Sequence, residues 1–510
     1  MISHQVLHRL APALFTTAPG LPSTIPGPEP SRWLSTGGSL LPWAADSLGH
    51  ASLLFRRYGR LVALVRGGGM RHISADPACP GTILTYGAKA VEAATTAHEV
   101  YTKVSLVGAL HPGPEAQPRQ QALLTFGAGL FVENGDQHRR HRRLLAPAFS
   151  RKRLASYAEQ MVRITDAVLA TWTPGSQRSI DLDMRQLTSK IVSETLLGAG
   201  SDTESARATG SLARAIQLLG DPLTRLLPFD LPGLPYSRYL DATTELEETM
   251  LSLLEARKRE VFAQAASEKG DMLSALLTAH DAETDSRLSD HEILGHVSVF
   301  FAAGHETSAN ALSWTLFLLA LFPEVTARAS EEVDAVLRGG EPTPESLERL
   351  VYLGAIVKES LRLFTPAPWN GRVLGQETEL LGHRLPAGAE VLVSIYETHR
   401  DAEVFAAPLR FIPERWETIQ PSAYEYTPFS AGPRTCIGAA FATMEIKIVL
   451  AMILQRFRMA LVPQRIDRFA ELVLAPKALR MRVLKRDGRF EDSRARLTGD
   501  VFDMVELPLF

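Results

Sequence analysis

Apolar residues recur every three to four positions along much of the chain, and this period predicts helices. The pattern extends from about residue 136 to residue 362 and is clearest over 154–172, 241–266 and 289–322. Proline and glycine cluster at 221–235, which predicts a loop between two of the helices. Most of the molecule is therefore expected to be helical.

The helix that is expected to begin near Ser289 is the best defined. Ser289 and Glu292 have the spacing of a capping box, and Pro323 supplies a stop. A helix of this length spans about 50 Å, enough to cross a whole domain. Its apolar run also contains His305 and Asn310, which are costly in lipid, so a buried core helix is favoured over a membrane helix.

Strand-like patterns occur only in short segments. The run LVALVRGGGMRHISADP at 61–77 predicts a hairpin in a small sheet. The segments 383–396 and 472–486 alternate enough to be strands, and the apolar segment 439–454 reads as another helix. The sequence therefore predicts a mainly α fold with small β-sheets attached.

We expect one domain over residues 31–486, between an irregular N-terminal lead-in at 1–30 and a C-terminal tail at 487–510. The lead-in is rich in proline and glycine and has no long apolar run. This composition predicts neither a signal peptide nor a membrane anchor.

Charge and cysteine content indicate which partners and which cellular compartment to expect. The chain has 54 Lys and Arg against 57 Asp and Glu, so a net charge of -3 gives no reason to expect nucleic acid as a partner. Cys79 and Cys436 are the only two cysteines, too few for a disulfide framework. We therefore expect a soluble, cytoplasmic protein, in which Cys79 matches no motif and is inert.

Cys436 stands in the segment FSAGPRTCIG at 429–438, with Gly432 and Gly438 on either side. Glycines let the backbone approach a flat cofactor, and N–H groups at a helix start favour a thiolate. A lone cysteine is more often a buried structural residue. Zinc fits poorly, because it prefers three or four clustered Cys or His ligands.

This segment resembles the heme-binding loop of the cytochrome P450 superfamily, with the Phe, Gly, Arg, Cys and Gly positions of that loop all filled. The resemblance implies the P450-like fold, in which a long central helix lies over heme b (iron protoporphyrin IX). It also implies that Cys436 is the thiolate ligand of the iron and that Arg434 meets a heme propionate. Phe429 and Gly438 complete the cofactor-binding positions of the loop.

The segment AGHETS at 303–308 resembles the oxygen-activating segment of that family. Ala303, which the resemblance places against the heme, and Thr307 are one turn apart on one helix face, and Gly304 is expected to widen the groove between them. The family uses this hydroxyl with its acidic neighbour to deliver protons, which makes Thr307 and Glu306 the candidate catalytic residues. Alternatively, Thr307 merely bonds back to the carbonyl of Ala303, as helical threonines often do.

Glu359 and Arg362 put opposite charges three residues apart, a spacing that is usually a solvated surface pair. The resemblance instead implies that Glu359, Arg362 and Arg415 form a buried structural network near the heme loop. Trp416 stands where phenylalanine is commoner in the family.

The segment GDQHRRHRRLL at 135–145 resembles the helix that contacts the heme propionates. By that resemblance His138 and Arg142 both reach propionate oxygens, and Arg372 is a third propionate ligand. For the other arginines a solvated helix face is the simpler interpretation, namely for Arg139, Arg140 and Arg143.

The resemblance implies a monooxygenase that inserts one oxygen atom from O2 into an apolar organic substrate. Electrons are expected from a separate ferredoxin or flavodoxin, because no flavin or iron–sulfur motif is evident. Its docking surface is expected to be the basic run formed by Arg139, Arg140, Arg143, Arg151, Lys152 and Arg153. The distal pocket is expected to be lined by residues of 108–127 together with Phe300, Phe301, Ala302, Pro366, Ala367, Pro368 and Trp369.

Two alternatives stay open. One is a heme-thiolate peroxygenase or isomerase that acts without external electrons. The other is a non-catalytic heme-binding or recruitment module. Such proteins tend to disrupt the oxygen-activating segment or lose the cysteine, and this sequence does neither.

Overall fold

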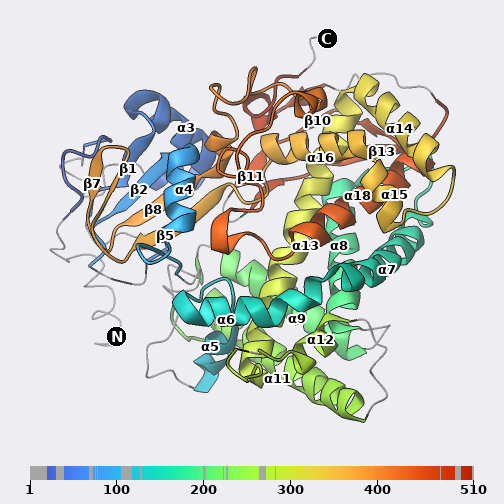
Figure 1. The fold of residues 1–510 in the computed structure, drawn as a ribbon. Helices are drawn as coiled ribbons and strands as arrows, with labels where there is room; N and C mark the ends of the chain where they lie inside the picture. Colours follow the sequence, from blue (N-terminus) through green and yellow to red (C-terminus); the bar gives the residue numbers. More distant parts are fainter. Residues whose placement is uncertain are drawn as a thin grey trace.

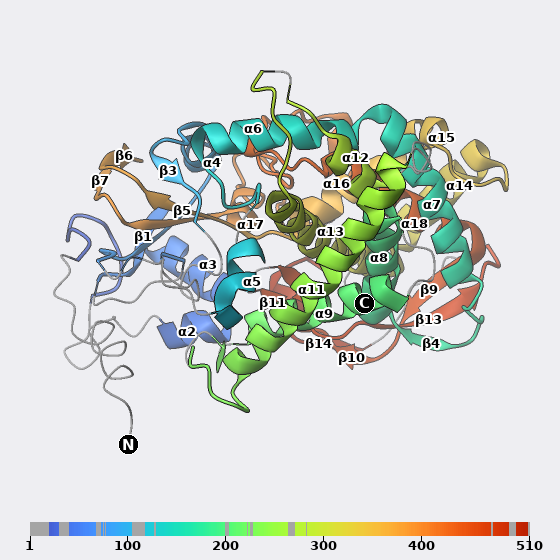
Figure 2. The ribbon, with the colours of Figure 1, turned by 90° about the horizontal axis from the view of Figure 1, so that it is seen from below.

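The computed structural model describes residues 20–29, 40–67, 73–74, 76, 78–104, 118–126, 129–198, 203–221, 223–224, 228–263, 271–281, 283–470, 473–488 and 496–507. Over these residues the chain forms a helical body with small sheets attached (Figures 1 and 2), so the predicted fold class is confirmed.

The α-helices are α2 (Leu40–Ala45), α3 (Ser47–Tyr58), α4 (Ala88–Thr96), α5 (Gln121–Phe126), α6 (Gly135–Leu145), α7 (Arg151–Leu169), α8 (Ile180–Leu197), α9 (Thr203–Gly220), α11 (Pro235–Phe262), α12 (Met272–Thr278), α13 (Asp290–Leu321), α14 (Pro323–Leu337), α15 (Pro344–Arg349), α16 (Val351–Leu363), α17 (Ile395–Thr398) and α18 (Ala439–Arg456). The strands are β1 (Leu61–Val65), β2 (Thr82–Tyr86), β3 (Tyr101–Thr102), β4 (Gln177–Ser179), β5 (Trp369–Leu374), β6 (Thr378–Leu380), β7 (His383–Leu385), β8 (Glu390–Ser394), β9 (Phe457–Leu461), β10 (Gln464–Arg465), β11 (Arg468–Ala470), β12 (Leu474–Pro476), β13 (Arg480–Lys485) and β14 (Leu497–Thr498).

Helix α13 passes through the middle of the helical body (Figure 1) and is the predicted long helix. The capping box is present: the Glu292 carboxylate accepts from the Ser289 N–H at 2.7 Å, and the Ser289 hydroxyl accepts from the Glu292 N–H at 3.3 Å. Farther along, Trp314 is fully buried and stacks on Phe364 with 4.3 Å between the ring centroids. This packing makes α13 the scaffold onto which α8, α16 and α18 are assembled.

The largest sheet has the strand order β1-β2-β8-β5-β3 and lies beside the helical body, on the left of Figure 1. Strand β1 pairs antiparallel with β2, which lies outside 61–77, and most of the second half of the predicted hairpin lies outside the described residues. Alternate residues of β1 pack to opposite sides, Leu61 and Ala63 with helix α4 and Val62 and Leu64 with helix α3. Because both faces are covered, β2 (TILTY) is buried along most of its length and shows no polar–apolar alternation, which is why it was missed.

The described part of the C-terminal tail packs on the main core. Val501, Met504 and Val505 are fully buried there, and the Glu506 N–H donates to the Leu409 carbonyl at 2.8 Å. At the other end of the chain, the described residues 20–29 contain no helix or strand, and their Ile25 is fully buried.

Within the described residues, no single helix has both the length and the apolar composition needed to cross a membrane. The pair formed by α13 and α14 reaches these two criteria only together, and it is bent by 111°.

Candidate functional site

Cys436 lies in a loop that the short 3-10 helix η4 (Gly432–Arg434) leads into and that α18 follows. The Cys436 N–H donates to the Phe429 carbonyl at 2.7 Å, which closes the loop on itself. Gly432 has a φ of 64°, and a Cβ there would lie 2.8 Å from the carbonyl oxygen of Thr95. Only glycine fits this position, so the loop is held against the end of α4.

The Cys436 side chain is exposed, yet desolvation by the surrounding protein raises the pKa of its thiol. The Gly438 N–H and the charge of Arg142 act in the opposite direction, as the helix-start interpretation predicted, but they do not outweigh desolvation. Coordination to a metal deprotonates such a thiol outright. By contrast Cys79 is buried, and desolvation raises its pKa to about 11, which agrees with an inert residue.

On α13, Ala303 is exposed and Thr307 is half-buried. The Thr307 hydroxyl donates to the Ala303 carbonyl at 2.6 Å, which is the alternative that the sequence left open. A hydroxyl has one hydrogen and two lone pairs, so in this arrangement Thr307 can accept a further hydrogen bond but cannot donate one. Any proton delivery by Thr307 requires its hydroxyl to rotate away from Ala303.

Gly304 does not widen the groove between Ala303 and Thr307, and this prediction was wrong. A Cβ on Gly304 would lie 3.2 Å from Cγ2 of Val192, so the glycine lets α8 approach α13 closely. At the same level the Thr188 hydroxyl of α8 donates to the His305 carbonyl at 2.8 Å. Gly304 therefore serves helix packing on the side of α8.

The expected propionate ligands lie close to one another and to the cysteine loop. Arg142 donates to the carbonyl of Thr435 at 2.7 Å, directly beside Cys436. Arg434 donates to the carbonyls of Leu130 (3.3 Å) and Glu133. Arg372, on β5, is buried and donates to the Ala94 carbonyl at 3.0 Å.

These cations perturb one another. Desolvation, with the charge of Arg434, lowers the pKa of Arg372 to about 9. Desolvation, with the charges of Arg434 and Arg142, lowers the pKa of His138 to about 4. Desolvation also lowers the pKa of Arg434, to about 10. Positive charge is therefore concentrated here beyond what the described protein groups compensate.

The Nη2 atom of Arg372 is buried and has no hydrogen-bond partner among the described residues. A buried guanidinium donor without an acceptor is costly, and it indicates that an anionic group belongs at this place. The propionates of a heme whose iron reached Cys436 would be such anions. The residues present thus fit the cofactor that the resemblance implied.

Lys103 joins this group, although no sequence pattern pointed to it. Desolvation and the charges of Arg372 and Arg434 lower its pKa well below the usual range. Its ammonium lies 4.1 Å from the centre of the Phe131 ring. A single lysine after a two-residue strand matches no motif, so only the fold reveals it.

Glu359 forms the buried network that the resemblance implied. Its carboxylate accepts from Arg362 at 2.9 and 3.0 Å and from Arg415 at 2.8 Å. Trp416 adds a further donor, from its indole Nε1 at 3.1 Å, which phenylalanine could not supply. The network ties α16 to the segment that precedes the cysteine loop.

Two of the arginines assigned to a solvated helix face are engaged in ion pairs. Arg140 donates to the Glu292 carboxylate at 2.9 Å, and Arg143 donates to the Asp281 carboxylate at 2.9 Å. Arg139 is exposed and pairs with the exposed Asp136. The solvated interpretation therefore holds for Arg139 and was wrong for Arg140.

The expected distal pocket can be assessed only in part, because most of 108–127 lies outside the described residues. Phe301 is 2% exposed and packs beside the His305 ring, so it belongs to the core. Phe300 is half-buried and meets the ring of Phe149 edge-on at 5.4 Å. Trp369 packs on Trp43, with 5.0 Å between the ring centroids.

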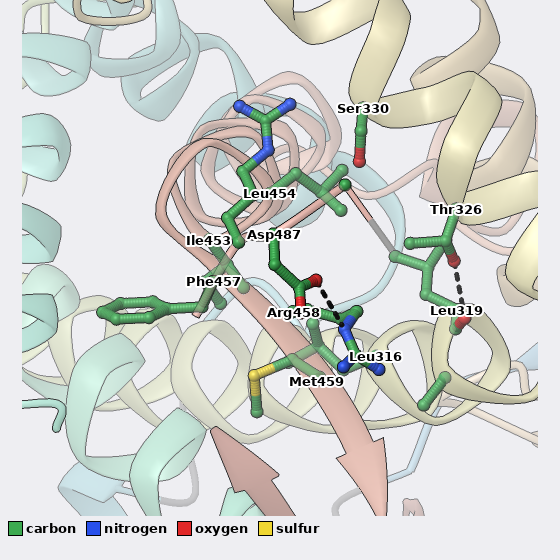
Figure 3. Close-up of a pocket in the computed structure, with 13 residues that line it drawn as sticks. Leu316, Leu319, Thr326, Ser330, Ile453, Leu454, Phe457, Arg458, Met459 and Asp487 are labelled. Carbon is green, nitrogen blue, oxygen red and sulfur yellow. Dashed lines mark hydrogen bonds and ion pairs between the residues drawn. The ribbon is translucent and has the colours of Figure 1, made fainter. Parts of the chain in front are cut away.

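A small cavity is found elsewhere, among the C-terminal ends of α13 and α18 and strand β9 (Figure 3). Its volume is about 20 Å³, room for a single water molecule, and the Arg458–Asp487 ion pair lies at its edge. Ile453 and Leu454, at the opposite end of α18 from Cys436, line it. It is too small for an organic substrate.

Glu445, on α18, is an acidic residue that the sequence analysis did not single out. Its side chain is fully buried, and desolvation raises its pKa to about 8, with the Ser308 hydroxyl acting in the opposite direction. The carboxyl group is therefore protonated at neutral pH, next to the residue that follows Thr307.

Comparison with known proteins shows the family of this chain. The model of the cytochrome P450 family matches residues 96–483. Cyclooctat-9-en-7-ol 5-monooxygenase of Streptomyces melanosporofaciens is 34% identical over 355 residues, which cover 67% of this chain and 75% of that enzyme. Pentalenene oxygenase of Streptomyces avermitilis is 33% identical over 374 residues, which cover 71% of this chain and 80% of that enzyme. The crystal structure of the cytochrome P450DA heme domain superposes with a TM-score of 0.76 at 26% identity, covering 91% of this chain and 98% of that one.

Proposed function

Since this chain belongs to the cytochrome P450 family and is a monooxygenase of that family, we propose that it inserts one oxygen atom from O2 into an apolar organic substrate, by hydroxylation or epoxidation. The observation that carries the proposal is the pairing of Cys436, in its closed loop, with a neighbouring basic cluster in which Arg372 Nη2 has no acceptor among the described residues.

The cofactor that fits these residues is heme b. Cys436 would ligate its iron, and the basic side chains of the cluster would hold its propionates, namely His138, Arg142, Arg372, Arg434 and Lys103. When bound, the heme supplies the reduction of dioxygen and the transfer of one oxygen atom to the substrate. The protein residues hold it in place and control protons around it.

Proton delivery is assigned to Thr307 and Glu306. The Thr307 hydroxyl, on the same accessible face of α13 as Ala303, is free to accept a hydrogen bond while it donates to that carbonyl. Rotation of the hydroxyl lets it pass a proton toward the cofactor side, and Glu306 is the adjacent acid that can renew the proton. A peroxygenase or isomerase would not need this relay.

The substrate is proposed to be a hydrocarbon-rich molecule. The names of the two Streptomyces relatives give cyclooctat-9-en-7-ol and pentalenene, an unsaturated alcohol and an unsaturated hydrocarbon. The side chains expected beside Ala303, such as Phe300 and Ala367, are apolar, which suits a substrate of that kind. Screening of terpenoid, polyketide and aromatic compounds for a spin-state change of the heme identifies the class.

Electrons are proposed to come from a separate ferredoxin or flavodoxin in the cytoplasm. The match to the family model spans most of the chain, and the two cysteines exclude an internal four-cysteine iron–sulfur cluster. Product formation that depends on an added reductase system would support this proposal, and equal turnover with hydrogen peroxide alone would favour a peroxygenase.

The thiolate ligand provides the direct test. The reduced carbon monoxide complex should show the strongly red-shifted Soret band of a thiolate-ligated heme, and Cys436→Ser should lose it. Cys79→Ser is the matched control and should keep the band. An unchanged band in Cys436→Ser would contradict the assignment of the ligand.

A further inference from the structure

A second buried polar cluster lies next to the propionate cations. His141, on α6, is fully buried, and its two ring nitrogens face two carboxylates: Nδ1 lies 2.6 Å from Glu133 and Nε2 lies 2.8 Å from Glu292. Arg140 shares the same Glu292 oxygen at 2.9 Å. The same Arg140 nitrogen also lies 2.8 Å from His141 Nε2, so Glu292 gathers both basic side chains on one oxygen.

His141 and the neighbouring His296 have pKa values that shift in opposite directions. Desolvation acts against a charge on His141, but the hydrogen bonds and charges of Glu133 and Glu292 outweigh it and raise the pKa of His141. His296, 4.8 Å away between ring centroids, is also fully buried, and desolvation with the charge of His141 lowers its pKa to about 3. The neutral ring of His296 can therefore accept a hydrogen bond.

These two histidines fix the loop 129–134 from both sides. The Leu130 N–H donates to His296 Nδ1 at 3.2 Å, while Glu133 is held by His141. Gly129, with a φ of 106°, sits so close to α13 that a Cβ would lie 3.2 Å from the carbonyl oxygen of Gly295. The loop is thereby seated on α13 with little freedom to move.

The same loop supplies the acceptors of Arg434. Leu130 and Glu133 offer their carbonyls, and Asn134 offers its side-chain oxygen at 2.9 Å. Arg434 forms no ion pair with a carboxylate of the described residues, so its position depends on these neutral acceptors. Arg434 stands two residues before Cys436.

We propose that His141 is a positioning residue for Arg434. Its ring holds Glu133 and hence the loop 129–134 against α13, and the loop in turn holds the guanidinium in the place where it meets a heme propionate. This inference rests on the proposed heme site and adds to it a residue that acts through Arg434 without touching the cofactor.

The sign of the change in the heme midpoint potential separates positioning from plain charge. Glu133→Gln removes a negative charge and keeps the shape of the side chain. If Glu133 acted only through its charge, this substitution would raise the potential, because reduction adds an electron to the heme. If Glu133 acts by holding the loop, Arg434 becomes mobile and the potential falls.

We expect the potential to fall in Glu133→Gln and in His141→Gln. We also expect heme transfer to apomyoglobin to become about tenfold faster, equivalent to about 1.4 kcal/mol. The matched control is Asp136→Asn, which removes an exposed carboxylate from the same helix as His141 and should keep the wild-type rate and potential. Should His141→Gln fail to fold, as circular dichroism would reveal, Glu133→Gln decides the question alone.

A raised potential in Glu133→Gln, or a rate of heme transfer equal to that of Asp136→Asn, would overturn the proposal. If neither the wild type nor Asp136→Asn shows the thiolate-type heme spectrum, the proposed function is contradicted, and this inference with it. When both proteins show a normal spectrum, an unexpected potential or rate in Glu133→Gln overturns the role of His141 and leaves the heme site standing.

Discussion

The hydroxyl of Thr307 donates to the carbonyl oxygen of Ala303 at 2.6 Å on the accessible face of α13. This bond gives the hydroxyl one resting orientation from which it must turn in order to deliver a proton. The helix therefore holds the Thr307 hydroxyl near the proposed site of proton delivery, while its hydrogen is bonded to the Ala303 carbonyl.

Replacement of Thr307 by alanine should separate heme binding from proton delivery. We expect Thr307→Ala to bind heme normally and to lower product formed per electron consumed by at least about tenfold, with the missing electrons recovered as hydrogen peroxide. Thr307→Ser keeps a hydroxyl and is the matched control. An unchanged ratio of product to electrons in Thr307→Ala would leave Thr307 as a structural helix residue only.

Substitutions in the Glu359 network should lower the unfolding free energy by different amounts. Glu359→Gln leaves Arg362 and Arg415 without their charge partner and should cost about 3–5 kcal/mol of unfolding free energy. Trp416→Phe removes one donor of several and should cost about 1–3 kcal/mol. Urea unfolding of the two variants beside the wild type measures both values. Equal losses would show that the indole donor matters as much as the buried charge.

The local parts of the molecule could be predicted from sequence. Helix α13 begins and ends within a residue of its prediction, because its capping box and Pro323 are short-range signals. The cysteine loop is likewise one continuous segment. The role of Gly304 was misjudged because Val192, which it contacts, belongs to another helix.

Long-range juxtapositions could not be predicted in the same way. The sequence analysis did not single out His141, and nothing in the sequence relates it to Glu292 or His296, which lie on a different helix. Their meeting depends on how α6 crosses the start of α13. The same limit applies to Lys103, whose neighbours are set by β5 and the cysteine loop.

Glu445 should make stability depend on pH. Its pKa is about 8 in the folded protein against 4.5 for the ordinary side chain, so the folded state holds this proton more tightly than the unfolded state. The contribution to stability is full below pH 4.5, is lost as the pH rises toward 8, and reaches on the order of 5 kcal/mol.

Urea unfolding at pH 5 and at pH 8 checks this expectation. Glu445→Gln cannot ionise, so its stability relative to the wild type should increase between the two values of pH. Glu159→Gln, which replaces an exposed carboxylate on α7, is the control and should follow the wild type. A parallel response of all three proteins would show that Glu445 does not ionise over this range.

Electron donors are expected to dock near the start of α7. In the structure, fewer residues of the predicted basic run carry an uncompensated charge that can guide them. Arg140 and Arg143 are compensated by Glu292 and Asp281, so their charges add little at a distance. Lys152 is exposed and forms no ion pair with the described residues, and Arg139 pairs only with an exposed aspartate. Arg151 pairs with the exposed Glu348, whereas Arg153, like Lys152, forms no ion pair with the described residues. Steering of an acidic ferredoxin therefore falls mainly to Lys152 and Arg153, with Arg139 beside them.

We expect the double variant Arg139→Glu with Lys152→Glu to slow heme reduction by a ferredoxin at low salt and to flatten its dependence on ionic strength. Rim charges act mainly on the rate of encounter, and salt screens them over about 10 Å at 0.1 M. The control is Arg214→Glu, a charge reversal at an exposed ion pair between α9 and α11, which should keep the wild-type rate and salt slope. Stopped-flow reduction across a salt series measures both quantities. Because the double variant leaves every proposed heme ligand intact, equal rates and equal slopes in all three proteins could only mean that the donor docks on another surface.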